Sequence, residues 1–212
     1  MKRDRVGMAA AILSLAGTIA AYPFLPATVP LHWDFAGRVD SWGPRWNMLW
    51  LGALPLATAL LLRLLPRLDP RRASYERHAR AYAIIGRLIV LALAAIAWVA
   101  ILAALGLGLD VGVLVRLLLG LLFVGLGNFM GTLKPNYFVG IKTPWALADD
   151  EVWRLTHRRG ALVFVALGAL FILSLAIPAG RALEALVLAS TLGGVAYLYL
   201  YSYLCWRRIR RA

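Results

Sequence analysis

The chain has 212 residues, of which 62% are hydrophobic and 16% are charged, with a net charge of +13 at pH 7. Its length and its nearly continuous hydrophobic runs exclude separate soluble domains, so we expect one integral membrane domain over residues 1–212. The single cysteine, Cys205, excludes an internal disulfide.

Six stretches without a charged residue fill most of the sequence. Most are long enough, or nearly so, for the roughly 20 residues that a helix needs to cross the hydrocarbon core. Because an unpaired peptide group in lipid costs several kcal/mol, each stretch should be helical. The sequence therefore predicts an all-α, polytopic bundle of six transmembrane helices. The stretches run Val6–Leu31, Trp46–Leu62, Leu88–Leu109, Leu117–Leu133, Gly160–Gly180 and Ala185–Trp206.

The basic residues predict the orientation of these helices. With the N-terminus inside, 19 of the 23 lysines and arginines fall on the cytoplasmic side; the exceptions are Arg38, Arg45, Arg116 and Arg181. Short cytoplasmic loops retain basic residues, so both termini are predicted to be cytoplasmic. The net charge then indicates contact with anionic lipids of the cytoplasmic leaflet. It does not indicate direct nucleic-acid binding, because no basic strand or helix outside the membrane carries interleaved aromatic residues.

The segment Tyr22–Arg45 between the first two stretches is predicted to be an ordered, Pro-rich outer loop. Four prolines and two glycines rule out a regular helix and favour an extended, polyproline-like start followed by turns. We expect it to fold over the bundle. The apolar anchors for this docking would be Leu25, Val29, Leu31 and Phe35.

Aromatic and polar side chains are dense in this outer loop, and we predict that they bind a ligand. A metal could use the imidazole of His32 with the carboxylates of Asp34 and Asp40, but no regular element fixes their geometry. We therefore favour Trp and His at the level of the lipid headgroups, with solvated carboxylates, and predict no metal site. The candidate ligand-binding residues are His32, Trp33, Asp34, Phe35, Asp40 and Trp42.

The basic linker Arg67–Arg87 is predicted to form an amphipathic helix on the cytoplasmic surface that runs into the third span. Within it, Arg72, Glu76 and Arg80 are spaced four apart, so Glu76 can pair with either arginine on one helical face.

The fourth hydrophobic stretch contains closely spaced glycines and one arginine. Gly127 and Gly131 lie on one helical face, where small residues let helices approach closely. Arg116 must sit at membrane depth near the outer end. We expect it to extend outward or to pair with Asp110; the alternative, a buried Arg116, would indicate a functional site.

The inner loop Met130–Arg159 is the richest polar segment. Asp149 can cap the helix that follows, with Asp150 and Glu151 in its first turn. We expect Trp145 to lie at the headgroups. Two interpretations remain open, an ordered signalling platform or a well-packed connector. The candidate residues are Asn136, Tyr137, Lys142, Thr143, Trp145, Glu151, Trp153, Thr156 and His157.

Two contacts are expected within this inner loop. Lys142 lies close enough in sequence to meet the acidic cluster, and His157 should face the bundle beside Trp153. Glu151 and His157 are about 240° apart on a helix, unlike a metalloprotease pair. No activated serine, cysteine–histidine pair or phosphate-binding loop appears either, so we predict neither an enzyme nor a bound cofactor.

At these two loops the sequence resembles known families. LPATVPLHWDFAGRVDSWGPRW resembles the DUF1648 signature, P-x-H followed by G-x-x-D-x-W-G. NYFVGIKTPWALADDEVWRLTHRRG resembles the signature of the Sdp-type immunity protein family. We expect the first within residues 1–66 and the second within residues 88–206. Three positions depart from these patterns, namely Pro44–Arg45, Lys142 and Ala146, and Lys142 lacks the bidentate geometry of the usual arginine.

The resemblance implies a function without chemistry on the ligand. The best-known members of the family protect a bacterium from its own secreted, membrane-damaging peptide toxin, and they hold a cytoplasmic transcriptional repressor at the membrane once toxin is bound. The chain is thus predicted to be an immunity or receptor protein. The alternatives are a small membrane enzyme or a transporter acting on a lipid-like or small polar substrate. Against a transporter, the spans are poor in acidic and amide groups and show no internal repeat.

Overall fold

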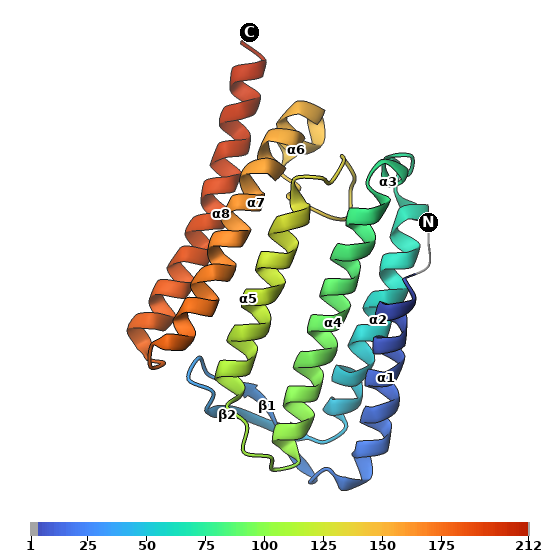
Figure 1. Ribbon diagram of the computed structural model, residues 1–212, viewed down its shortest axis with the longest axis vertical. Helices are drawn as coiled ribbons and strands as arrows, with labels where there is room; N and C mark the ends of the chain where they lie inside the picture. Colours follow the sequence, from blue (N-terminus) through green and yellow to red (C-terminus); the bar gives the residue numbers. More distant parts are fainter. Residues whose placement is uncertain (1–3, 212) are drawn as a thin grey trace.

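The computed structural model describes residues 4–211 and contains six helices that are long and apolar enough to cross a membrane, as predicted. Lys2 and Arg3, which contribute to the charge bias above, lie outside the described residues. Both ends of the described chain lie at the same end of the bundle (Figure 1). We call this the inner end and the opposite one the outer end, following the charge-based orientation. The long helices are α1 (Arg5–Ala21), α2 (Asn47–Leu68), α4 (Ala79–Ala104), α5 (Val111–Met130), α7 (Asp150–Leu173) and α8 (Arg181–Ile209).

The six helices form two groups (Figure 1). Helices α1, α2 and α4 contact one another in a three-helix cluster, while α5, α7 and α8 form a row in which α5 and α7 pack most extensively. The contact between α4 and α5 joins the two groups. Small residues permit these close approaches, because lipid supplies no hydrophobic force that would drive helices together.

The crossing of α5 and α7 depends on glycine. A Cβ on Gly168 would lie 2.7 Å from the carbonyl oxygen of Gly120, and one on Gly127 would lie 2.8 Å from that of Ala161. No larger residue fits at these points without moving a backbone. Gly131, paired with Gly127 in the sequence pattern, has more room, since its Cβ would lie 3.8 Å from Arg158.

The outer loop contains regular structure that the sequence analysis did not predict. A short 3₁₀ helix, η1 (Tyr22–Phe24), leads into strands β1 (Thr28–Trp33) and β2 (Val39–Pro44), which pair as an antiparallel hairpin. The predicted extended start is therefore wrong for Tyr22–Phe24, and a polyproline-like conformation occurs only from Leu25 (φ −73°, ψ 139°). Pro30 and Pro44 are tolerated because a two-stranded ribbon has two free edges, and the register shifts around His32 mark an irregular ladder.

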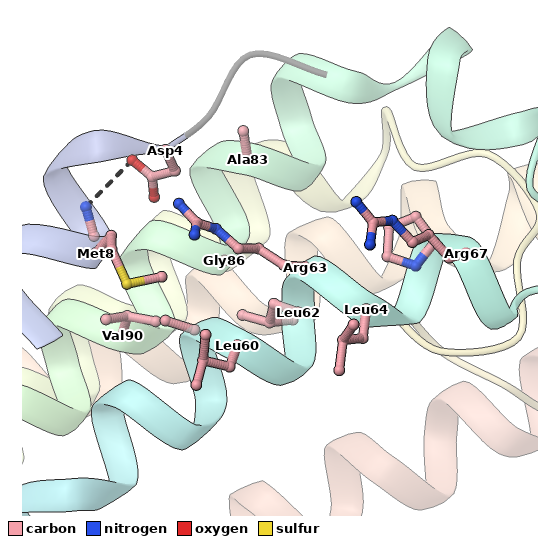
Figure 2. Close-up of a pocket in the computed structure, with 13 residues that line it drawn as sticks. Asp4, Met8, Leu60, Leu62, Arg63, Leu64, Arg67, Ala83, Gly86 and Val90 are labelled. Carbon is pink, nitrogen blue, oxygen red and sulfur yellow. Dashed lines mark hydrogen bonds between the residues drawn. The ribbon is translucent and has the colours of Figure 1, made fainter.

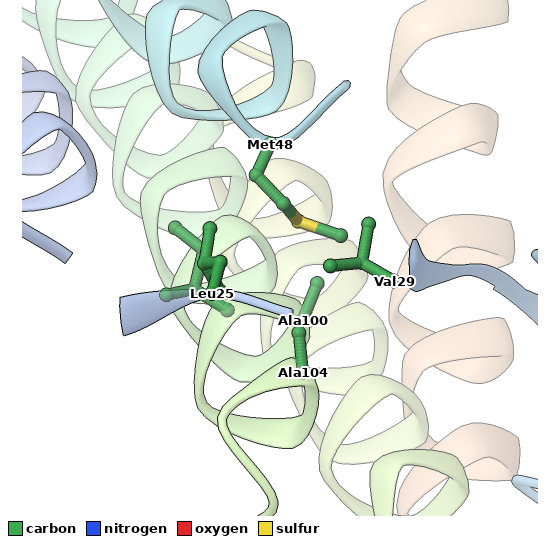
Figure 3. Packing of buried hydrophobic residues seen from close by; sticks show 6 residues of the cluster. Leu25, Val29, Met48, Ala100 and Ala104 are labelled. Carbon is green, nitrogen blue, oxygen red and sulfur yellow. The ribbon is translucent and has the colours of Figure 1, made fainter. Parts of the chain in front are cut away.

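The hairpin lies across the outer end of the bundle, as expected (Figure 1). Leu25 and Val29 are buried together with Met48 of α2 and with Ala100 and Ala104 of α4 (Figure 3). The prediction for Leu31 is wrong, since 39% of it is exposed. Regular alternation would place Leu31 on the face of the buried Val29, but the register shift between Pro30 and His32 interrupts the alternation at Leu31.

The predicted surface helix between α2 and α4 is also wrong. The chain turns after Leu68, forms only the four-residue helix α3 (Ser74–Arg77), breaks at His78 and continues as α4. None of the ion pairs between residues 4 and 211 involves Glu76. On the same side of the bundle, the inner loop forms the short helix α6 (Pro144–Ala148), with Pro144 in its first turn.

Candidate functional site

A cavity of about 390 Å³ lies between the hairpin and the α4–α5 connection at the outer end. Its walls include Trp33 and Trp42 from the two strands, Pro26 and Pro30 from the loop, and Leu107 from the connection. Trp42 is 61% exposed although the hairpin around it is ordered. Two indole rings beside proline and leucine offer an apolar surface with a polar N–H on each ring, which suits an amphipathic ligand.

The polar side chains of the hairpin bind one another in pairs. Asp34 builds the turn: its carboxylate accepts hydrogen bonds from the amides of Ala36 and Arg38 (both 2.9 Å) and from the Arg38 side chain (2.8 Å). These bonds, first the one from the Arg38 amide, lower the pKa of Asp34. His32 and Asp40 face each other across the strands, with 2.6 Å between Nδ1 and Oδ1. The structure thus joins His32 with Asp40 but not with Asp34, and no cluster of three potential metal ligands occurs in residues 4–211.

Phe35 and Arg116 occupy a second contact beneath the tip of the hairpin. Phe35 packs into the apolar cluster of Phe171, Leu183 and Val187 on α7 and α8, and the Arg116 guanidinium carbon lies 5.2 Å from its ring centre. Arg116 is only 6% exposed, so the prediction that it extends outward is wrong.

The neighbours of Arg116 explain its burial. Its side chain donates to the backbone carbonyls of Gly112 and Ser174, each at 3.1 Å, and these bonds replace water at that depth. Asp110 is not its partner and instead caps α5 through the amide of Val113 at 2.9 Å.

Asn136 organises the turn of the inner loop that follows α5. It is fully buried; its carbonyl oxygen accepts from the amides of Phe138 (3.0 Å) and Val139 (2.7 Å), and its amide donates to the carbonyls of Lys134 (3.0 Å) and Val139 (2.9 Å). A side chain that satisfies both sides of a tight turn fixes the backbone.

His157 and Trp153 lie side by side on α7, as predicted, with ring centres 3.9 Å apart. His157 Nε2 accepts from the amide of Ile141 at 2.9 Å, and Nδ1 lies 2.9 Å from the Trp153 carbonyl, so this ring is neutral with its proton on Nδ1. The Trp153 indole donates to the Leu133 carbonyl at 2.9 Å. The pair therefore holds the inner loop onto α7.

The remaining buried candidates connect α6 to the long helices. The hydroxyl of Thr143 accepts from the amide of Ala146, which caps α6, and it also bonds Ser202 of α8. Thr156 is fully buried, but its hydroxyl has no hydrogen-bond partner among residues 4–211. Trp145 packs against Tyr199 and Tyr203 of α8.

Three candidate residues of the inner loop are exposed. Glu151 forms a bidentate pair with Arg154, and Tyr137 is 43% exposed. Lys142 does not meet the acidic cluster: its ammonium donates to the carbonyl of Phe138 at 3.2 Å. The predicted contact is wrong because α6 separates Lys142 from Asp149, which caps α7 as expected.

Sequence reasoning missed Asp69, which anchors the inner loop from the α2–α4 segment. It is 2% exposed and accepts from the hydroxyl of Tyr75 (2.8 Å) and from the amides of Arg71 (2.7 Å) and Tyr137 (2.9 Å). The dipeptide Asp69–Pro70 after a long helix was the available signal, since Asp before Pro favours a turn that its carboxylate can close.

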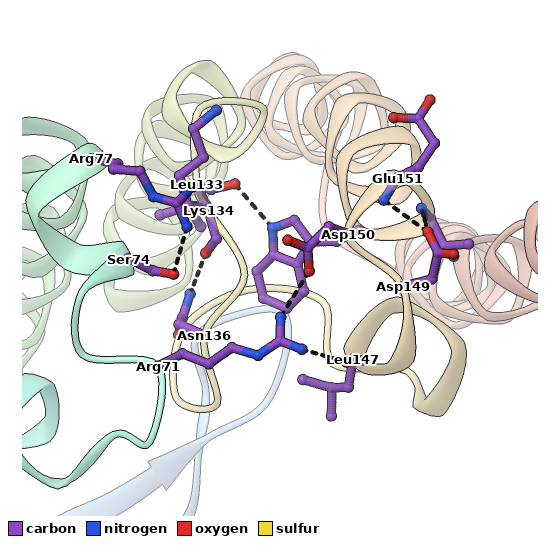
Figure 4. Close-up of polar contacts among 12 residues, drawn as sticks. Arg71, Ser74, Arg77, Leu133, Lys134, Asn136, Leu147, Asp149, Asp150 and Glu151 are labelled. Atoms are coloured by element: carbon purple, nitrogen blue, oxygen red, sulfur yellow. Dashed lines mark hydrogen bonds and ion pairs between the residues drawn. The ribbon is translucent and has the colours of Figure 1, made fainter.

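Arg71 adds a second connection between the same two segments (Figure 4). Its guanidinium donates to the carboxylate of Asp150 at 2.9 Å and to the carbonyl of Leu147 at 3.1 Å. It also lies 5.7 Å from the ring centre of Tyr137. One arginine from the first half of the chain thus contacts three residues of the inner loop.

Two further side chains beside Asp69 have shifted pKa values. Burial and the nearby Asp69 carboxylate raise the pKa of Tyr75, so its hydroxyl keeps the proton that it donates. His78, 4% exposed, packs against Tyr75 with ring centres 5.1 Å apart and the rings tilted by 39°, and neither ring nitrogen has a well-formed hydrogen bond within residues 4–211. Burial lowers the pKa of His78, and the carbonyl of Ser74 partly offsets this lowering.

Six apolar helices closed by an outer hairpin and an inner hydrogen-bonded loop define a multi-pass membrane protein. Comparison with protein families makes this more specific. Residues 132–202 match the SdpI/YfhL protein family, and residues 9–58 match a domain of unknown function, DUF1648. The resemblance to the Sdp-type immunity family is thereby confirmed over residues 132–202, and the resemblance to DUF1648 over residues 9–58.

An individual relative supports the same assignment. The chain is similar to the immunity protein SdpI of Bacillus subtilis (strain 168), with 24% identity over 170 residues that cover 79% of each protein. No solved structure matches the chain.

Proposed function

We propose that this chain is a membrane immunity protein that binds a secreted, membrane-active peptide toxin at its outer hairpin. The observation that carries the proposal is the aromatic cavity beside Trp33 and Trp42, which lies at the predicted outer surface of a relative of an immunity protein. An apolar peptide that approaches from outside meets these rings before it reaches the lipid core. Asp40, whose side chain is 47% exposed, is the accessible carboxylate for a cationic group of the peptide.

A ligand bound in this cavity would contact a hairpin that packs against both groups of helices. Trp33 packs with the cluster around Ala100 and Ala104 of α4, while Phe35, two residues later, packs against α7 and α8. A ligand that moves the strands therefore biases how the two groups sit against each other, which is the requirement for a signal to cross the bundle.

At the inner end we propose a surface that a cytoplasmic repressor recognises. The exposed candidates Tyr137, Lys142 and Glu151 lie on a loop that is held by both groups of helices through Asp69 and His157. A shift between the groups would move this loop, and the exposed side chains would carry the change to a partner. The buried candidates of the loop act as connectors in this proposal.

Toxin challenge tests the outer site. A sensitive bacterium that lacks its own immunity protein would express this chain and receive the secreted peptide toxin of the family. The natural chain should protect, and Trp42→Ala should lower the tolerated toxin dose about tenfold while membrane levels stay unchanged. Trp50→Ala is the matched control, because Trp50 is 70% exposed on α2 and does not line the cavity. Equal protection by both variants would contradict the binding site.

Recruitment of a soluble partner tests the inner surface separately. Lys142→Ala and Tyr137→Ala should keep protection but reduce toxin-dependent membrane recruitment of the repressor. If both variants recruit it normally, the inner loop is a connector only.

A further inference from the structure

A second and larger cavity, of about 730 Å³, opens between α1, α2 and α4 at the inner end (Figure 2). Its walls are mainly apolar and come from Met8 of α1, Leu60 and Leu64 of α2, and Val90 of α4. Neither the hairpin nor the inner loop lines it.

The rim of this cavity carries uncompensated positive charge. Arg63 and Arg67 are exposed, lie one turn apart on α2, and form no ion pair within residues 4–211. Asp4 is the one acidic side chain among the described residues that line the cavity, and its carboxylate is already bound to Arg87 at 2.9 Å. Figure 2 shows both free guanidinium groups turned toward the side of α2 on which Asp4 lies.

We propose that this cavity is a binding site for an anionic phospholipid of the inner leaflet. The phosphate binds between Arg63 and Arg67, whose planar guanidinium groups match its oxygens. One acyl chain runs along the apolar wall formed by Leu60, Leu64 and Val90. Both parts of the site are needed. A soluble anion gains nothing from the apolar wall, and a zwitterionic lipid such as phosphatidylcholine carries, beside the same phosphate, a quaternary ammonium that the two arginines repel.

The depth of the two arginines fits a headgroup. Arg63 precedes the end of α2 at Leu68 by five residues, which is roughly 7.5 Å along the helix axis. Arg67 lies about 6 Å further toward the end by the same rise. Both charges therefore lie within the last two turns of α2, on either side of Leu64, and Leu60 continues the apolar wall about one turn deeper than Leu64.

Lipid retained by the purified protein tests the proposal. The full chain would be reconstituted in nanodiscs of phosphatidylglycerol and phosphatidylcholine, extracted in mild detergent, and its bound lipids counted by native mass spectrometry. We expect one retained phosphatidylglycerol and no retained phosphatidylcholine. Arg63→Gln with Arg67→Gln should lower its affinity roughly thirtyfold, at about 1 kcal/mol for each basic residue near the surface.

Two further variants distinguish lipid binding at this specific site from a general attraction of lipid by surface charge. Arg207→Gln with Arg208→Gln removes the same charge from the inner end of α8, away from the cavity, and should keep the lipid. Ala83→Phe keeps every charge but fills the cavity, and it should lose the lipid while the protein stays monodisperse. Equal loss in the α8 variant, no loss in the Arg63/Arg67 variant, or equal retention of phosphatidylcholine would each overturn the proposal.

Discussion

The outer hairpin touches the helices through apolar side chains and backbone, whereas the inner loop is tied to them by buried polar side chains. Leu25, Val29 and Phe35 dock the hairpin, and its polar residues bond mostly to one another, as Asp34 does to Arg38. In the inner loop, Asp69 is one of several buried polar groups that bond to other segments of the chain. The buried polar residues of the inner loop are therefore committed to structure, while the aromatic residues of the hairpin remain available to a ligand.

Among the variants considered, Gly140→Ala should destabilise the protein most, because it disrupts the polar contacts of the inner loop. Gly140 has φ +121°, which disfavours other residues, and an added Cβ would collide with the His157 ring that binds Ile141. Strain of roughly 1–3 kcal/mol together with a buried hydrogen bond worth about 1 kcal/mol should destabilise the protein by about 3 kcal/mol. Membrane accumulation and thermal unfolding would measure this.

The matched control is Gly193→Ala, because nothing lies within 4 Å of the position of its Cβ. It should leave accumulation unchanged. If Gly140→Ala accumulated as well as this control, the inner loop would not be the rigid connector described above.

Variants of Asp69 and Asp150 compare the stability contribution of a buried carboxylate with that of an exposed one at the inner end. Asp69→Ala leaves the Tyr75 hydroxyl and the Tyr137 amide without their buried acceptor, so we expect a loss of about 2–3 kcal/mol. Asp150→Ala removes the exposed half of its pair with Arg71 and should cost less than about 1 kcal/mol. Thermal unfolding of the two variants in one detergent would rank them; the reverse order would contradict the role of Asp69.

Docking of the hairpin can be weakened without disturbing the inner end. Gly37 has φ +81°, and its Cβ would lie 2.7 Å from the amide nitrogen of Gly112, where the tip of the hairpin meets α5. Gly37→Ala should cost about 1–2 kcal/mol locally. Hydrogen exchange should then accelerate in Thr28–Trp33 but not in the inner loop, and protection should fall.

Gly180→Ala, in the α7–α8 connection, has open space around its Cβ, does not line the cavity and serves as the control. Faster exchange throughout the protein after Gly37→Ala would mean that the hairpin supports the whole bundle.

Features that depend on residues close together in the sequence could be predicted, and features that depend on distant partners could not. Spans depend on local composition, so all six were predicted, and the cap at Asp149 was predicted because it acts over three residues. The hairpin was not predicted because its four prolines favoured an irregular loop over paired strands. Arg116 and Asp69 were misjudged because their partners lie far along the chain: Ser174 is 58 residues from Arg116, and Tyr137 is 68 residues from Asp69.

His78 gives the smallest expected effect and tests whether the inner end tolerates a new charge. Burial lowers its folded-state pKa below the ordinary 6.5, so the unfolded chain binds a proton that the folded chain does not. The stability associated with His78 is therefore complete above about pH 6.5 and declines as the pH falls toward its lowered folded-state pKa. Lys134 and Arg77 lie near enough to oppose protonation as well.

His78→Phe should keep an aromatic ring in contact with Tyr75 and Tyr82 while removing the titrating group. Between pH 7 and pH 5 its unfolding temperature should fall less than that of the natural chain. If the unfolding temperature of His78→Phe fell as much over this range as that of the natural chain, the buried imidazole of His78 would not be a source of acid sensitivity at the inner end.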